Sequence, residues 1–310
     1  MWVPIRHCVG WGFILFNLCV MSSTKTGGDP WFLTDCPRDA MQGIGPMIPT
    51  PQKVAYLSAL MKVGFDVLDA GSFVSPKAVP QMADSAAVLE ALPETQTAVL
   101  AIVANERGAH EALAHGRPDF IGFPFGISET FQQRNTGGGI DEGWRRLDRI
   151  QNAASAAGKG VVVYLSMGFG NPYGDPWSPA LAGEWALRLH EELGVAHLAL
   201  SDTVGQADEG MVESVCAQVI AASPEMAVGV HLHGRREAAA PLMEAAWRGG
   251  CRRFDGALGG LGGCPMAKDD LVGNLPTEIL MGAPAGWGGA KKEWNQEALT
   301  LAQSLLSGLQ

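Results

Sequence analysis

Short apolar runs, rich in β-branched residues or bounded by turn residues, recur along the chain at a spacing of about 30 residues. We predict a strand at each run, namely at residues 31–34, 65–69, 97–103, 120–125, 161–166, 197–201, 227–233 and 253–255. The segments between them have the periodicity of helices, at residues 51–63, 83–91, 106–115, 141–157, 179–193, 209–222 and 238–248. Residues 291–309 are predicted to form a terminal helix on the outside.

This alternation of strand and helix predicts the fold. Eight strand–helix units require a parallel sheet and favour a closed (β/α)8 TIM barrel with an extra C-terminal helix. An open doubly wound sheet is the alternative, but no G-x-G-x-x-G sequence follows an early strand. Because no low-complexity linker interrupts the pattern, we expect one domain over residues 26–310, preceded by an N-terminal extension over residues 1–25.

The extension contains an apolar stretch at residues 9–20 that is short for a transmembrane helix. No A-x-A-like cleavage site follows this stretch, and a polar segment begins at Met21. We interpret Met21 as the true initiator, with a secretion signal as the alternative, and expect a cytoplasmic protein that does not bind membranes.

The amino-acid composition limits the kinds of partner that the chain is expected to bind. The formal net charge of −10 argues against nucleic acid, whose phosphates require a basic face. The six cysteines show no C-x-x-C pairing, so we expect reduced thiols.

In a (β/α)8 barrel the chemistry lies at the carboxyl ends of the strands, and most of these ends carry polar residues here. We interpret Asn105, Ser166 and Asp255 mainly as turn formers, which polar residues at strand ends commonly are. The remaining candidates are Arg38, Asp39, Asp69, Ser72, Asp202, Thr203, His231 and His233.

The pair His231 and His233 has the strongest chemical signal. In a strand these alternate side chains share one face, where two neutral imidazoles could bind one metal ion, although buried histidines are often only core residues. Asp39 and Asn274 are candidate partners. Such a nitrogen and oxygen donor set suits Mg²⁺ or Mn²⁺, with Co²⁺ as a third option, and no organic cofactor is expected.

Several motifs resemble those of the 3-hydroxy-3-methylglutaryl-CoA lyases of the DRE-TIM metallolyase superfamily, in the same order from Trp31 to Ile279. The Ser-Phe-Val-Ser-Pro-Lys and Gly-Leu-Gly-Gly-Cys-Pro stretches are typical of the lyase branch, whereas Arg-Asp and His-x-His indicate only the superfamily. The matching stretches are residues 34–42, 71–82, 200–205, 230–233, 259–265 and 273–278.

This resemblance implies retro-Claisen cleavage of a 3-hydroxy-3-methylglutaryl-type acyl-CoA to acetyl-CoA and a β-keto acid. It implies that a metal ion is bound by Asp39, His231, His233 and Asn274. Asp39 and His231 would also take part in catalysis. Arg38 would stabilise the enolate oxygen, Cys264 would protonate the enolate carbon, and the neighbouring glycines would let the loop close over the substrate. Glu278 would orient a ligand, and the residues expected to contact substrate are Gln42, Asp69, Ser72, Asp202 and Arg235.

Structural roles remain open for most of these residues. Asp39 could be a helix N-cap, Arg38 a surface charge and Cys264 a buried apolar residue. Asn274 could cap the helix that starts near Pro276, and Glu278 could be a first-turn carboxylate.

Three departures from the lyase pattern affect the expected substrate. Gly43-Ile44 replaces an Asn-Glu pair, and Gly234-Arg-Arg-Glu237 replaces Asp-Thr-Tyr-Gly. Asp69 replaces a glutamate, and its shorter side chain could fail to reach the same partner.

The Gly234-Arg-Arg-Glu237 stretch places Arg235 near the predicted metal ligands. We hypothesise that Arg235 binds an additional carboxylate of a larger or more acidic thioester, since guanidinium pairs with carboxylate through two hydrogen bonds. The alternative is that Arg235 is a solvated surface charge.

Two other functions compete with the lyase: a Claisen-condensing synthase of the same superfamily, and a non-catalytic metal-binding barrel. We also expect a homodimer, although the sequence itself does not reveal the oligomeric state.

Overall fold

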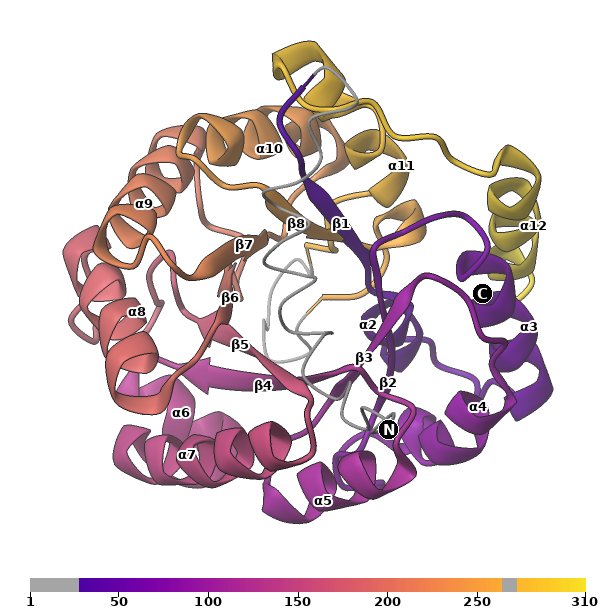
Figure 1. Cartoon of the computed structure of the whole chain (residues 1–310), viewed down its shortest axis with the longest axis horizontal. Coiled ribbons are helices and arrows are strands. Elements are labelled where there is room, and N and C mark those ends of the chain that lie inside the picture. Colours follow the sequence, from indigo (N-terminus) through magenta and orange to yellow (C-terminus); the bar gives the residue numbers. More distant parts are fainter. Residues whose placement is uncertain (1–27, 264–271) are drawn as a thin grey trace, which may run out of the picture.

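The chain forms a closed barrel of eight parallel strands in the order β1 to β8, surrounded by helices (Figure 1). This computed structural model describes residues 28–263 and 272–310. The strands are β1 (Phe32–Asp35), β2 (Val67–Ser72), β3 (Ala98–Ile102), β4 (Phe120–Gly126), β5 (Gly160–Ser166), β6 (His197–Ser201), β7 (Ala227–His231) and β8 (Arg253–Gly256). The predicted TIM barrel is confirmed, and each predicted strand overlaps an observed one.

The outer layer contains the helices α3 (Thr50–Leu60), α4 (Ser85–Ala91), α5 (Glu106–His115), α6 (Glu129–Thr136), α7 (Ile140–Ala156), α8 (Pro179–Leu193), α9 (Glu209–Ala222) and α10 (Ala239–Arg248). Local capping sets several ends. Asn105, Ser178 and Asp208 accept hydrogen bonds from backbone N–H groups in the first turns of α5, α8 and α9. Asn105, which we interpreted from the sequence as a turn former, is therefore the N-cap of α5.

Shorter elements lie at the barrel ends. The helices α2 (Pro37–Gln42) and α11 (Thr277–Leu280) follow β1 and β8, and four 3₁₀ turns connect other elements: η1 (Pro80–Met82), η2 (Arg236–Ala238), η3 (Leu258–Gly260) and η4 (Ala283–Trp287). The terminal helix α12 (Gln296–Ser307) packs beside α3 on the outside (Figure 1). It starts later than predicted because the Asn295 side chain caps it at Ala298.

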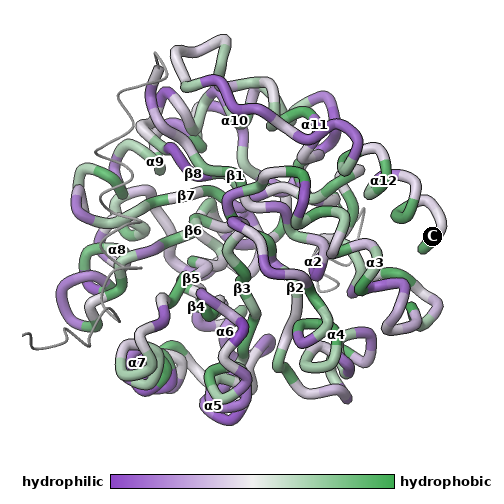
Figure 2. Tube along the Cα trace, turned by 45° about the vertical axis from the view of Figure 1, so that its right-hand side comes forward, coloured by the Kyte–Doolittle hydropathy of each residue, from purple (hydrophilic) through white to green (hydrophobic). Residues whose placement is uncertain are grey.

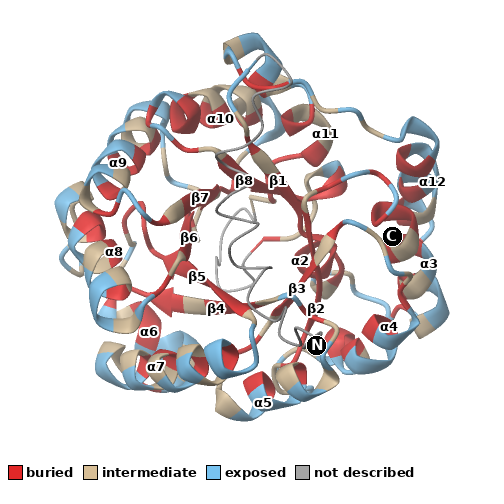
Figure 3. Cartoon of the chain, viewed as in Figure 1, coloured by how far each residue is buried: buried red, intermediate tan, exposed pale blue. Residues whose placement is uncertain are grey.

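Apolar side chains fill two regions. The larger core lies between the strands and the helices, and a smaller cluster of Val67, Leu100, Val162, Tyr164 and Ala199 lies inside the barrel. The strands are buried, whereas the outer helix faces are exposed (Figure 3) and carry most of the hydrophilic segments, together with the loops (Figure 2). Burial of the strands on both faces explains why they appear in the sequence as nearly continuous apolar runs.

Alternation along each strand decides which polar groups enter the barrel. In β8, Phe254 points outward and stacks on Trp247 with the ring centroids 6.3 Å apart, so Arg253 and Asp255 point inward. Because Arg253 lies at the start of β8 and Asp255 near its end, polar side chains enter the barrel at both of its ends. In β2, the register of its pairing with β3 shifts between Asp69 and Gly71.

Among the described residues, no helix is both long enough and apolar enough to cross a membrane. The predicted extension at residues 1–25 lies outside the described residues.

Candidate active site

Three candidate metal ligands meet at the carboxyl end of the barrel. The ligand atoms of Asp39, His231 and His233 all lie within 4.8 Å of one another. Asp39 comes from the helix α2, which follows β1, while the histidines lie at the end of β7 and just beyond it. Residues almost two hundred positions apart in the sequence therefore converge because the barrel closes between β1 and β8.

Backbone pairing brings the fourth candidate, Asn274, into the same place. His233 and Asn274 form an isolated antiparallel bridge, and Gly234 N–H donates to the Gly273 carbonyl at 3.0 Å. The Asn274 amide donates to Asp39 Oδ2 at 2.6 Å and to the Leu261 carbonyl at 2.8 Å. Asn274 is thus not a helix cap in this structure; its side chain lies among the candidate ligands.

Three buried atoms of this group lack a hydrogen-bond partner within the described parts of the chain. They are His231 Nδ1, His233 Nε2 and Asn274 Oδ1. Imidazole nitrogens and amide oxygens bind metals, and a buried polar atom without a partner is costly, so a cation between His233 Nε2 and Asn274 Oδ1 would satisfy both. The set of one carboxylate, two imidazoles and one amide oxygen fits a divalent cation.

The charges of the ligands suit this interpretation. Burial raises the pKa of Asp39, but Arg38 and His231 outweigh it and hold the pKa at about 2, so the carboxylate is ionised. Burial, followed by repulsion from His231, lowers the pKa of His233 to about 4. His233 is therefore neutral near pH 7, as a metal ligand must be.

A residue that the sequence reasoning interpreted as a turn former lies behind His231. Asp255 Oδ2 lies 3.4 Å from His231 Nδ1, and the Asp255 side chain is fully buried. Burial lowers the pKa of His231, but Asp255 outweighs it and gives a net rise. A carboxylate behind a metal-binding histidine fixes the orientation of the ring, so Asp255 is positioned to hold the ring of His231 should it bind a cation.

A second group of three, Cys36, His231 and Asp255, also lies within 4.8 Å. Burial and nearby carboxylates raise the pKa of the Cys36 thiol well above its ordinary value. Because a thiol must lose its proton to bind a metal, this group is the weaker candidate.

Arg38 lies beside the candidate ligands and is held by three side chains. Its Nε and Nη2 donate to Asp69 at distances of 2.5–3.2 Å, and its Nη1 donates to Asp39 and to Gln42 Oε1 at 3.0 Å. Gln42 in turn donates to Asp39 Oδ1 at 2.7 Å. The shorter Asp69 therefore does reach a partner, and Arg38 is a buried, fixed cation rather than a surface charge.

Asp69 is fully buried beneath Arg38. Burial raises its pKa to about 6 although Arg38 acts in the opposite direction. Because both of its oxygens bind Arg38, its contribution in this structure is to orient the guanidinium.

The other predicted substrate contacts have different surroundings. Ser72 Oγ donates to the Ile102 carbonyl at 3.3 Å, and the Asp202 carboxylate accepts hydrogen bonds from the backbone of Gln206 and Ala207. Arg235 is exposed in the loop after β7. The Asp202 backbone N–H donates to the His231 carbonyl at 3.0 Å, but none of these three side chains forms a hydrogen bond with a candidate ligand in the described residues.

Glu278 binds elsewhere than expected. It accepts a hydrogen bond from Arg236 Nη1 at 2.9 Å and from Gly259 N–H at 3.1 Å. In the described part of the chain it makes no hydrogen bond to a candidate ligand, so it supports the loop rather than orienting a histidine. The predicted acid, Cys264, lies outside the described residues.

The glycine segment after β8 passes close over the ligands. A Cβ atom on Gly262 would lie 2.6 Å from both Asn274 Nδ2 and Asp39 Oδ2, and the Gly262 φ is +91°. Only glycine combines this backbone conformation with so close an approach.

Comparisons with known proteins agree with this architecture. The HMGL-like family model matches residues 31–305. The mitochondrial hydroxymethylglutaryl-CoA lyase of Rattus norvegicus is 36% identical over 255 residues, which is 81% of this chain and 77% of the rat protein.

Two solved structures are also similar. The HMG-CoA lyase of Bacillus subtilis superposes with a TM-score of 0.83 at 28% identity, over 90% of this chain and 94% of that one. An HMG-CoA lyase from Acinetobacter baumannii, in complex with coenzyme A and 3-methylmalate, gives a TM-score of 0.80 at 27% identity, over 90% and 92% of the two chains. The chain belongs to the HMGL-like family.

Proposed function

We propose that this protein is a metal-dependent carbon–carbon lyase that cleaves a 3-hydroxy-3-methylglutaryl-CoA-type thioester to acetyl-CoA and a β-keto acid, which is acetoacetate for the parent substrate. The convergence of Asp39, His231, His233 and Asn274 beside a buried arginine carries this proposal, in a chain whose relatives bear the name of this lyase. The coenzyme A in the similar Acinetobacter structure supports an acyl-CoA substrate.

Mg²⁺ or Mn²⁺ is the cation that we propose for these four residues, because oxygen donors and neutral imidazoles suit both. When bound, such a cation supplies a Lewis acid that lowers the pKa of the substrate hydroxyl. Asp39 contributes the charge and His233 the neutral imidazole, while Asp255 keeps the ring of His231 in place.

The reaction is redox neutral. The C3 hydroxyl loses its proton and becomes a ketone as the C2–C3 bond breaks, and the electron pair of that bond remains on the thioester fragment as an enolate. One proton added at C2 then gives acetyl-CoA. The protein must therefore stabilise a negative oxygen and deliver one proton.

Arg38 is the group that we assign to the enolate oxygen. Its guanidinium is held by Asp69, Asp39 and Gln42, so it is already oriented before charge develops on the substrate. We retain Cys264 as the proposed donor of the proton to C2, on the resemblance of its sequence motif alone.

Arg235 is our candidate for acyl-group selection. It is exposed in the loop after β7, while the neighbouring Arg236 is bound to Glu278. We expect Arg235→Ala to lower kcat/KM for thioesters with an additional carboxylate, and Arg236→Ala, which removes the same charge, to spare this preference. Equal kcat/KM values of wild type and Arg235→Ala across a panel of thioesters would refute the carboxylate contact.

Acetyl-CoA release tests the proposed function directly. Purified protein with Mg²⁺ or Mn²⁺ should release acetyl-CoA from 3-hydroxy-3-methylglutaryl-CoA, and EDTA or His233→Ala should abolish the release. Product formed only in the condensing direction would favour a synthase, and no product from several thioesters would favour a non-catalytic barrel.

We further propose a cytoplasmic location and a homodimer that requires neither nucleic acid nor membrane. The thiols of Cys36, Cys216 and Cys251 are free and buried, as is usual in a reducing compartment.

A further inference from the structure

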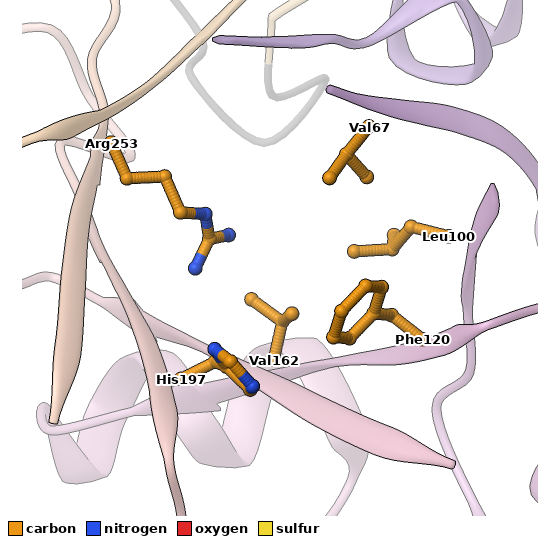
Figure 4. Close-up of a pocket in the computed structure, with 6 residues that line it drawn as sticks. All are labelled: Val67, Leu100, Phe120, Val162, His197 and Arg253. Carbon is orange, nitrogen blue, oxygen red and sulfur yellow. The ribbon is translucent and has the colours of Figure 1, made fainter. Parts of the chain in front are cut away.

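A buried carboxyl group lies at the end of β1, on the face of the strand that is turned away from the barrel interior. Val67 points into the interior, where it lines a small cavity (Figure 4). Thr34 is the partner of Val67 in the pairing of β1 with β2, so Thr34 faces the interior as well. Because side chains alternate along a strand, Asp35 faces the surrounding helices, and it is completely buried there.

Asp35 has no counter-charge in these surroundings. In the described part of the chain no cation forms an ion pair with it, and the nearby carboxylates of Glu278 and Asp69 repel its charged form. Burial raises the pKa of Asp35 to about 7, although its hydrogen bond with Thr277 acts in the opposite direction. Its contribution to the structure is therefore a hydrogen bond rather than a charge.

This hydrogen bond joins β1 to the helix α11. Thr277 Oγ1 donates to Asp35 Oδ1 at 2.5 Å, and both side chains are fully buried. Thr277 is the first residue of α11. Gly256 of β8 leaves room for the contact, because a Cβ there would lie 3.0 Å from Thr277 Oγ1 and 2.8 Å from the Leu275 carbonyl oxygen.

The residues just before Thr277 include Asn274, whose amide oxygen we place among the candidate metal ligands. Asn274 is buried, and its backbone forms the bridge with His233. The Leu275 carbonyl accepts a hydrogen bond from Ala257 N–H at 3.0 Å, and Thr277 N–H donates to the Ala257 carbonyl at 3.1 Å. Backbone pairing thus fixes this segment beside two strand ends, and the hydroxyl of Thr277 fixes it to a third.

We propose that Asp35 is a positioning residue for the cation site: through Thr277 it holds the segment that presents Asn274 Oδ1 to the cation. This inference rests on the proposed function, because it requires that the cation binds at Asn274. The only side chain in the described residues that forms a hydrogen bond with Asp35 is that of Thr277. Loss of this bond should therefore weaken cation binding and loosen the segment when no cation is bound.

Thr277→Val tests this inference, because valine has the shape of threonine without the hydroxyl group. We expect the Mn²⁺ affinity, measured by calorimetry, to fall about tenfold. Thr277→Ser keeps the hydroxyl and Asp35→Asn keeps an oxygen acceptor, so both should bind Mn²⁺ with an affinity close to that of wild type. In EDTA, the backbone amides of residues 274–280 should exchange hydrogen faster in Thr277→Val than in wild type.

Thr97→Val is the matched control. Thr97 is buried just before β3, and its hydroxyl donates to the Phe65 carbonyl at 2.9 Å, so this variant also loses a buried hydrogen bond. It should lower Tm but leave the Mn²⁺ affinity unchanged. Wild-type Mn²⁺ affinity in Thr277→Val, or an equal loss of affinity in Thr97→Val, would overturn the inference alone. A wild-type chain that binds no Mn²⁺ would overturn the proposed cation site and this inference with it.

Discussion

Replacement of Arg38 by methionine separates its electrostatic role in catalysis from its role in folding. The substitution removes three hydrogen bonds to Asp69 and one each to Asp39 and Gln42. Asp69 is fully buried, so its carboxylate would lose the cation that compensates its burial. Breaking a buried pair of this kind costs about 3–5 kcal/mol, which corresponds to a fall in Tm of roughly 10 °C.

The double variant Arg38→Met/Asp69→Asn removes both charges together. We expect it to regain much of the lost stability, because the fully buried Asp69 carboxylate is no longer left without its counter-charge. It should not regain activity: loss of a fixed donor to a developing oxyanion lowers kcat by about 10²–10³. The assay is acetyl-CoA release under saturating Mn²⁺, with Tm measured on the same samples.

Two results would refute this reasoning. If Arg38→Met retained kcat within about tenfold of wild type, the arginine would not stabilise the transition state. If the double variant recovered activity along with stability, the loss in the single variant would reflect misfolding.

Three further predictions follow from the same contacts. Asp255→Asn should weaken Mn²⁺ binding by roughly 10–100-fold through a misoriented His231, as isothermal titration would measure, and unchanged affinity would exclude this positioning role. Gly262→Ala should both destabilise the fold, by about 1–3 kcal/mol, and weaken Mn²⁺ binding, because its Cβ meets Asp39 and Asn274; Gly288→Ala, with φ +90° and open space, is the control that should show the strain alone. The pKa of His197 is about 3 in the folded chain against about 6.5 when unfolded, so between these values the unfolded state binds the proton and stability falls as the pH drops. This component should amount to about 2 kcal/mol between pH 7 and pH 5. His197→Leu should lose this pH-dependent component of the stability. If urea unfolding gave wild type and His197→Leu the same dependence of stability on pH, the pKa of His197 would not be lowered in the folded chain.

The strands could be predicted from the sequence because both of their faces are buried. β6 (His197–Ser201) coincides with its predicted range, and β5 and β8 each differ by one residue at one end. The short helix α2 was missed, because Pro37–Gln42 is too brief for a helical period and carries three polar side chains toward the site. The helix α6 was missed for a related reason, since Glu129–Thr136 is mostly polar.

Contacts between strands explain what the sequence could not predict at the site. Asp255 lies beside His231 because the pairing of β7 with β8 places these two residues opposite each other. The spacing of residues within a single segment does not indicate a contact between two strands. Glu278 was expected to orient a ligand, but the loop after β7 carries Arg236 to it instead. The ion pair between Arg236 and Glu278 depends on the paths of the two loops that carry these residues, which the sequence of neither loop indicates alone.

Titration with Mn²⁺ tests the four-residue cation site most directly. Calorimetry on the purified chain should give one Mn²⁺ per chain, and separate replacement of Asp39 by asparagine and His233 by alanine should each weaken binding by at least about 100-fold. Wild-type affinity in either variant would contradict the site, and with it the proposed cleavage.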